Sequence, residues 1–197
     1  MARMKAFDET LALEKAMRAF WSTGYDGTSM QMLEKAMGLK RTSIYNAYGN
    51  KRALFNQVIL HYQQTIIMDL MASVESEPDI RKAIANMLNG EIDLHFNHPN
   101  PGGCLIVLSV LEKAQHGDES SKILEQIVQQ MEHFLFEKMA HAQQEGQLSQ
   151  QLDIKSTSLA VATTVVGISA MGKAGFSKAS LRKIVAATTS ILDLSAT

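Results

Sequence analysis

Apolar residues recur at helical spacing along almost the whole chain. Leu13, Ala16, Met17 and Phe20, for example, follow the i, i+3, i+4, i+7 pattern of one helix face. The sequence shows neither the alternation typical of strands nor an internal repeat, so the pattern predicts an all-α fold. About nine helices are expected, near residues 8–24, 28–37, 41–48, 51–74, 80–92, 104–115, 123–145, 154–172 and 178–194.

Capping signals sharpen the first of these elements. Asp8 can cap the first helix and Gly24 can end it. Thr28, followed three residues later by Gln31, has the spacing of a capping box, and Gly38 can close the second helix. Two short helices joined by a tight turn at residues 38–40 therefore predict a helix-turn-helix, with the motif at about residues 29–48.

The second helix of this motif carries an unusual set of polar side chains. In a helix-turn-helix the second helix lies in the DNA major groove, where Arg, Asn, Thr and Ser can bind base edges. Ile44 is expected to point inward. The outward positions are Arg41, Thr42, Ser43, Tyr45 and Asn46. Lys51 and Thr28, each at the start of a helix, are candidates for phosphate contacts. An ordinary helical hairpin with a solvated outer face is the alternative.

Charge and composition fit this division. Residues 1–52 hold nine Lys/Arg and five Asp/Glu, a net charge of +4, whereas residues 53–197 hold ten and fifteen, a net charge of −5. We therefore expect a DNA-binding domain at 1–52 and a second domain at 53–197. The single cysteine excludes an internal disulfide framework and suits a reducing cytosol. Without an evident secretory signal or membrane span, a cytoplasmic protein with no membrane partner is expected.

The N-terminal segment resembles a known family. The run from Phe20-Trp21 through Gly24-Tyr25 and Thr28-Ser29 to Ala36-Met37-Gly38-Leu39 and Ser43 to Phe55 is similar to the N-terminal domain of TetR-type transcriptional regulators. The resemblance covers about residues 6–60. It implies a homodimeric repressor that binds double-stranded DNA at a near-palindromic operator and is released by a small-molecule effector.

By position, the resemblance gives base-facing roles to Arg41, Thr42, Ser43 and Asn46. Phosphate-binding roles fall to Thr28, Tyr45 and Lys51. The sequence also departs from the family pattern, because Lys40 replaces the usual small hydroxyl cap and Ala47 replaces an aromatic residue or His. The operator sequence therefore cannot be inferred from relatives.

The last two helices are the expected dimer scaffold, since small residues allow close helix approach and a wide apolar stripe follows. Interface candidates are Ala160, Gly167, Leu181, Ile184, Val185, Thr188 and Ile191. The alternative is that both helices cover the core of their own chain.

The middle helices, about 54–145, are expected to enclose an effector. Candidate wall residues are Tyr62, Phe96, Cys104, Leu108, Leu111, Met131 and Phe134. Cys104, after two glycines and at a helix start, is either a reactive thiol, part of a metal site with His95 and His98, or a buried small hydrophobe. The helical spacing of His133, Glu137 and His141 also suits a metal, although a solvated face explains it as well. No metal site is predicted.

Known catalytic and cofactor-binding patterns are missing from the sequence. It contains no glycine-rich phosphate loop, HExxH or GxSxG motif, so we expect neither an enzyme nor a cofactor. A helical dimeric enzyme and a DNA-binding module without an effector remain the alternatives. Loss of duplex binding as salt rises would argue against the first, and a ligand that weakens duplex binding would argue against the second.

Overall fold

The computed structural model describes residues 7–96, 101–112 and 117–192, and these residues form helices and turns without any strand. The elements are α1 (Glu9–Gly27), α2 (Met30–Met37), α3 (Arg41–Tyr48), α4 (Lys51–Tyr62), η1 (Gln63–Ile67), α5 (Met68–Ser76), α6 (Ile80–Phe96), α7 (Leu105–Leu111), α8 (Asp118–Gln144), α9 (Ile154–Lys173) and α10 (Lys178–Ser190). Because α4, the π-helical segment η1 and α5 follow one another without a break, the described residues form nine helices. The predicted all-α fold is confirmed.

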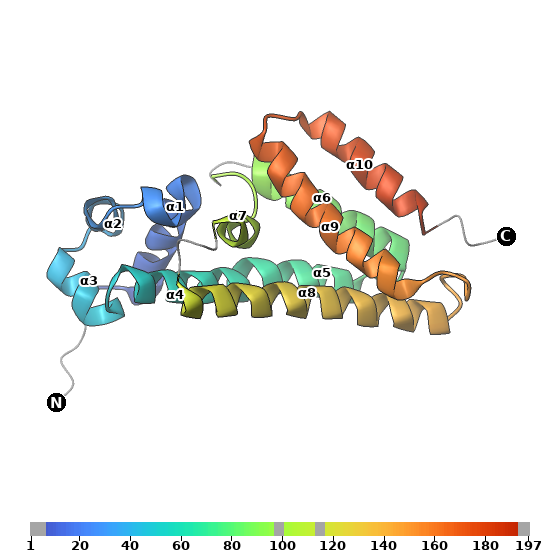
Figure 1. The fold of residues 1–197 in the computed structure, drawn as a ribbon, viewed down its shortest axis with the longest axis horizontal. Coiled ribbons are helices and arrows are strands. Elements are labelled where there is room, and N and C mark those ends of the chain that lie inside the picture. The colour runs from blue at the N-terminus through green and yellow to red at the C-terminus, as the bar shows by residue number, and fades with distance from the viewer. Residues whose placement is uncertain (1–6, 97–100, 113–116, 193–197) are drawn as a thin grey trace.

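The molecule is elongated. Helices α1–α3 lie at one end, and α6, α9 and α10 lie at the other (Figure 1). Helix α8 and the continuous α4–η1–α5 helix run side by side along the length between them, and α7 lies between the two ends (Figure 1). The long helices therefore link the helix-turn-helix end to the rest of the chain.

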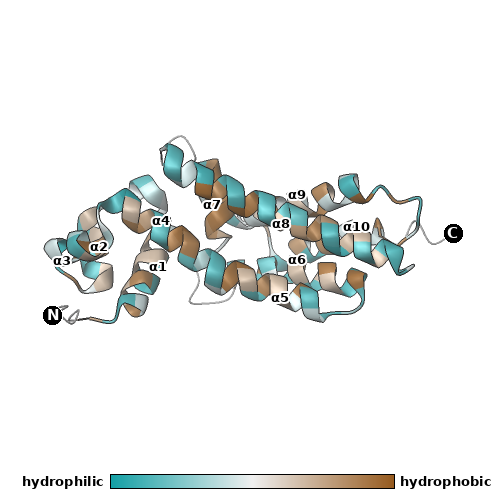
Figure 2. Cartoon of the chain, turned by 90° about the horizontal axis from the view of Figure 1, so that it is seen from below, coloured by the Kyte–Doolittle hydropathy of each residue, from teal (hydrophilic) through white to brown (hydrophobic). Residues whose placement is uncertain are grey.

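Two apolar cores follow this arrangement. The first combines α1–α4 with α7 and the start of α8, and its largest buried side chains include Phe20, Phe55 and Tyr62. The second joins α5, α6, α9, α10 and the later part of α8 around residues such as Ile84 and Leu181. Most of α7 is hydrophobic (Figure 2), and this suits a helix that packs against four others, α1, α4, α8 and α9. The first core thus extends beyond residue 52, where the sequence suggested a domain boundary.

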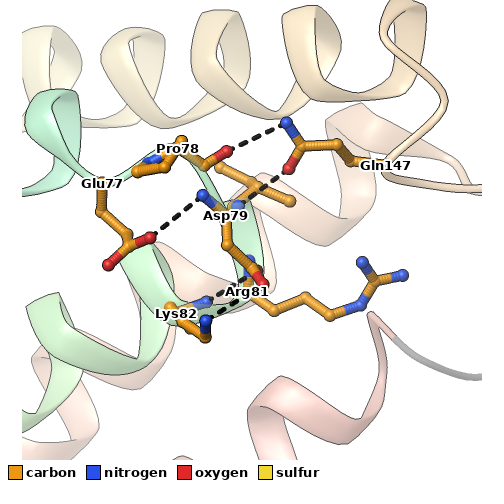
Figure 3. Close-up of polar contacts among 7 residues, drawn as sticks. Glu77, Pro78, Asp79, Arg81, Lys82 and Gln147 are labelled. Carbon is orange, nitrogen blue, oxygen red and sulfur yellow. Dashed lines mark hydrogen bonds and ion pairs between the residues drawn. The ribbon is translucent and has the colours of Figure 1, made fainter.

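The polar residues 75–79, which lie between the fourth and fifth predicted helices, lead into an ordered turn between α5 and α6. Asp79 Oδ1 accepts hydrogen bonds from the N–H groups of Arg81 and Lys82, at 3.0 and 3.2 Å, and so caps α6 (Figure 3). Gln147, beyond the end of α8, donates to the Pro78 carbonyl and accepts from the Ile80 N–H, each at 3.0 Å (Figure 3). These bonds fasten the α5–α6 turn to the end of α8.

Candidate nucleic-acid interface and effector cavity

The helix-turn-helix is formed by α2, a short turn and α3. Ser29 caps α2 by accepting the Met32 N–H at 3.2 Å. At the other end, Gly38 adopts a left-handed conformation with φ 69° and ψ 27°, which favours glycine. The N–H groups of Gly38 and Leu39 both donate to the Glu34 carbonyl, at 3.0 and 3.2 Å. This glycine lets the chain turn within two residues and start α3.

One side of α3 is fixed to the first core. Ile44 is fully buried, and Tyr48 is buried with its hydroxyl donating to the Glu9 carbonyl at 3.0 Å. The opposite side faces solvent. There the structure brings together the exposed side chains of Arg41, Thr42, Tyr45 and Asn46, with Ser43 half-buried beside them. The predicted inward and outward positions of α3 are confirmed, while their contacts with DNA stay predictions.

Glu34 compensates for the missing cap of α3. Lys40 occupies the cap position and makes no side-chain capping hydrogen bond. Instead, Glu34 Oε1 accepts the Arg41 N–H at 2.7 Å, while its Oε2 lies 3.5 Å from Arg41 Nε. An exposed ion pair of this kind contributes at most about 1 kcal/mol. Arg41 can therefore exchange Glu34 for another anion at little cost.

The predicted role of Thr28 is wrong. Its side chain is fully buried, and its hydroxyl donates to the Gly24 carbonyl at 2.6 Å and lies 2.7 Å from Thr23 Oγ1. It therefore fastens the end of α1 to the start of α2 and cannot reach a phosphate. Ser29, the next residue, is exposed and is the actual cap of α2. Thr and Ser can both cap a helix, so the Thr28-Ser29 pair is compatible with a cap at either residue.

Lys51 begins α4 and lies at the edge of the first core. Its Nζ is 4.3 Å from the centroid of the Tyr25 ring, a cation–π contact. Burial lowers the pKa of the ammonium group, and Asp26 acts in the opposite direction. Because the side chain is only half-buried, it remains near the surface that α3 forms with the start of α4. Its predicted phosphate contact is compatible with this position.

A cavity of about 250 Å³ lies in the body of the molecule, by which we mean the part formed by α4 to α10. It is enclosed between η1, α5, α6, α7, α8 and α9. Three of the predicted wall residues, Cys104, Leu111 and Met131, line it. The sequence did not point to Ile67, which the π-helical segment η1 supplies. The other predicted wall residues, Tyr62, Phe96, Leu108 and Phe134, do not line it.

These four side chains pack elsewhere. Tyr62 is fully buried in the first core, with its ring edge-to-face on Trp21 at 5.1 Å between centroids. Phe96 contacts the His95 ring, and Phe134 packs against the second core. Leu108 faces a separate hollow formed by α7 and the end of α1. The prediction was wrong for them because a helix in a layered bundle presents apolar residues to several neighbours, not to the cavity alone.

Sequence reasoning missed Glu91, a cavity residue on α6. Its side chain is 1% exposed, and it accepts a short hydrogen bond from the Ser169 hydroxyl. Burial raises the pKa of the carboxyl group to about 7, although the Ser169 hydrogen bond acts in the opposite direction. A signal was present, because Glu91 lies on the same helix face as Ile84 and Leu88.

Cys104 is a buried, protonated thiol. It is 3% exposed, and burial together with the nearby Glu91 raises its pKa to about 12. The hypothesis of a thiol activated by the helix start is therefore wrong for this conformation, since the loss of solvation outweighs the helix effect. His98 lies outside the described residues, and among those that are described no group of three His, Cys, Asp or Glu could hold a metal.

A chain of hydrogen bonds links this cavity to the helix-turn-helix end. The peptide between Gly103 and Cys104 donates its N–H to Ser169 Oγ at 2.8 Å. Its carbonyl accepts the Trp21 Nε1–H at 2.8 Å. Because Ser169 in turn donates to Glu91, three bonds connect the cavity carboxyl group to α1.

Two further polar contacts join the same parts of the molecule. The Glu112 carboxylate accepts the Tyr25 N–H at 3.2 Å, and it packs so closely on Gly24 that a Cβ there would lie 2.5 Å from it. Ser120 on α8 donates to Asn56 on α4 at 2.5 Å. Glycine at position 24, with φ 73°, both breaks α1 and leaves room for Glu112.

Helices α9 and α10 bury only one side of each in their own chain. Leu181, Val185 and Thr188 are buried against α6 and α9, so their predicted place in a dimer interface is wrong, and Ile184 is half-buried. Ala160 and Ile191 are exposed, and a Cβ on Gly167 would meet open space. By length and composition alone α9 could also cross a membrane, but it packs against α6, α8 and α10 of its own chain.

Comparisons with known proteins agree with this architecture. Residues 12–58 match the family described as bacterial regulatory proteins, tetR family, and residues 80–188 match the tetracyclin repressor-like C-terminal domain. The chain is 29% identical over 149 residues to the uncharacterized HTH-type transcriptional regulator YezE of Bacillus subtilis, covering 76% of this chain and 77% of YezE. It is 25% identical over 187 residues to the transcriptional repressor ComR of Escherichia coli, covering 94% and 89%.

Solved structures give the same result. A cysteine mutant of the TetR family regulator CifR, complexed with operator DNA, is 27% identical with a TM-score of 0.85, covering 95% of this chain and 98% of that one. AibR, in complex with isovaleryl coenzyme A and operator DNA, shares the fold at 20% identity and a TM-score of 0.65, covering 81% and 85%. With its outward-facing α3 and both family domains, this chain belongs to the TetR family and is a DNA-binding transcriptional regulator.

Proposed function

We propose that the chain is a repressor that binds a near-palindromic operator as a homodimer and is released by a small molecule in the body. The observation that carries this proposal is the polar outward face of α3, held rigidly by Ile44 and Tyr48. A recognition helix fixed in this way can enter the major groove without rearrangement. The relatives ComR and CifR, a named repressor and a regulator solved with operator DNA, support it.

Each exposed residue of α3 has a distinct expected role. Arg41 and Asn46 suit bidentate binding of guanine and adenine, and Thr42 and Ser43 can bind either base. Tyr45, which is 45% exposed, can donate its hydroxyl to a phosphate, as can Lys51 at the start of α4. The first group is expected to set sequence preference and the second to set overall affinity.

The outward faces of α9 and α10 are the proposed dimer interface. Leu159, Val166 and Ile191 are large apolar side chains left 38–46% exposed, and Gly167 leaves space for close approach of a second helix. Two copies of this helix pair form a four-helix, two-fold interface. Leu159 and Val166 also line the cavity, so a bound molecule lies close to the partner subunit.

Ligand binding is proposed to reach the DNA-binding end through the Glu91–Ser169–peptide–Trp21 hydrogen bonds. A ligand that moves Glu91 alters the acceptor of the Ser169 hydroxyl, and Ser169 positions the peptide that holds Trp21. The Glu112 and Ser120 contacts supply further paths between the same regions. Coupling of this kind is reciprocal, so duplex DNA must weaken ligand binding by the same factor.

The test is selection of bound duplexes from a random pool, followed by affinity measurements over a salt series. We expect a motif with two-fold symmetry and half-sites about one helical turn apart. Arg41→Ala should relax the preference at one base pair by about 1–3 kcal/mol, whereas Lys51→Ala should weaken all duplexes and lower the salt slope by about one. Failure to bind any duplex at low salt would refute the proposal. If both variants bound the symmetric motif with unchanged affinity and base preference, the assigned contacts would be refuted.

A further inference from the structure

The charge pattern of the cavity restricts what can bind there. Its wall is almost entirely apolar, and among the described lining residues the only ionisable side chains are acidic or weakly acidic: Glu91, Glu132 and the thiol of Cys104. No Lys, Arg or His is found in the described part of the wall. A ligand that carries a phosphate or carboxylate would therefore meet like charge without a counter-ion, at a high desolvation cost.

Glu91 is the buried charge that a ligand could neutralise. The groups that face it are the Ser169 hydroxyl, the Cys104 thiol and the Tyr62 hydroxyl, and none of these is a cation. A carboxylate that is enclosed without a positive partner destabilises the folded chain, so a cation placed beside it recovers a large part of that loss. A largely apolar wall with one fully buried acid, Glu91, is complementary to an apolar molecule with one positive group.

We propose that the effector is a small apolar molecule with a protonated amine, which Glu91 binds as an ion pair. This inference rests on the proposed function of the cavity as the effector site. The volume of about 250 Å³ lies below the range of about 300–1,000 Å³ typical of drug-sized ligands, so one ring with a short chain is the expected size. The isovaleryl coenzyme A of AibR, with its phosphates, belongs to a different chemical class.

The chain of hydrogen bonds from Glu91 to Trp21 gives a bound amine a route to the helix-turn-helix end. When a cation approaches, the carboxylate turns toward it and its hydrogen bond with Ser169 weakens. Ser169 is the acceptor for the Cys104 N–H, in the same peptide whose carbonyl holds Trp21. Neutral molecules of the same shape fill the cavity without pulling on this chain of bonds. We therefore expect amines, not their neutral analogues, to release DNA.

The experiment compares three matched probes: 4-phenylbutylamine, 4-phenylbutanol and 4-phenylbutyrate. Their dissociation constants are measured by calorimetry at pH 8 with the wild-type chain, Glu91→Gln and Glu132→Gln. The wild-type chain should bind the amine about 10–100-fold more tightly than the alcohol, the range for a hydrogen bond to a charged group. Glu91→Gln should lose most of that preference without affecting the alcohol. Glu132→Gln, which removes a less buried carboxylate, should lose far less.

Binding at pH 6 adds an independent readout, since Glu91 is then largely protonated and the amine preference should fall. Equal affinity for the amine and the alcohol, or an amine preference that survives Glu91→Gln, would overturn the inference. Duplex binding is measured on the same samples. If duplexes bind but no amine preference exists, the ligand class is wrong while the regulator stands; if no duplex binds at low salt, the proposed function itself fails. Thermal unfolding shows whether Glu91→Gln remains folded.

Discussion

The outward face of α3 and the wall of the cavity use polar groups in opposite ways. On α3 the polar side chains are exposed, and Arg41 already holds a replaceable partner in Glu34. In the cavity one carboxyl group, Glu91, is enclosed by apolar side chains and held by a single serine. Water weakens the electrostatic interactions of each charge on α3, whereas the exclusion of water strengthens those of the buried Glu91 carboxylate. Selectivity is therefore spread over several residues at the first site and concentrated in one at the second.

The largest expected effect tests how firmly the first core holds α3. Ile44→Ala removes a fully buried side chain that, with Tyr48, fixes α3 to the first core. We expect a loss of about 2–5 kcal/mol in the free energy of unfolding, measured by urea titration, because burial is lost and a cavity remains. Duplex binding should fall while amine binding in the body persists at low temperature. Leu181→Ala, in the second core, is the matched control, and equal loss of duplex binding in both variants would show that the two regions are not separable.

A smaller effect tests the cost of the buried charge. The folded pKa of Glu91, about 7, exceeds its ordinary value of 4.5, so the folded chain holds this proton more tightly than the unfolded chain does. Stability should therefore fall as pH rises from about 4.5 to 7, by up to roughly 3 kcal/mol, since one pKa unit corresponds to about 1.4 kcal/mol.

Replacement of Glu91 should remove this pH dependence. Glu91→Gln keeps an acceptor for Ser169 but no charge, so we expect a gain in the free energy of unfolding at pH 8 and little change at pH 5. Urea titrations at both values measure the difference. The same gain at both pH values would mean that packing, not charge, explains it.

The smallest effect tests the link between the two sites. Trp21→Phe keeps a ring against Tyr62 but removes the donor to the buried Gly103 carbonyl, at a cost of about 1–3 kcal/mol in stability. Duplex affinity should change little, whereas the factor by which 4-phenylbutylamine weakens duplex binding should shrink. Anisotropy titrations with and without the amine measure that factor. An unchanged factor would refute the proposed route through the Trp21 hydrogen bond.

Sequence periodicity predicted most of the fold because helix formation is local. The positions of Asp8 and Gly38 gave the start of α1 and the end of α2, and Ile44 gave the inward side of α3, since each depends on spacing within a few residues. Gly24, which was expected to end the first helix, is instead a non-helical break inside α1, which continues to Gly27. Spacing alone could not decide between neighbouring residues that suit the same local role. Thr28 and Ser29 both suit a cap, and only the packing of Thr28 against Thr23 and Gly24 decides between them.

The sequence by itself determined an all-α chain with a basic helix-turn-helix end, because those features follow from residue types at short separations. The tertiary structure alone decided which side of α6 and α7 meets the cavity, which side of α10 stays outward, and which peptide joins Glu91 to Trp21. These depend on the rotation of each helix about its own axis when it packs, and contacts between residues far apart in the chain fix that rotation.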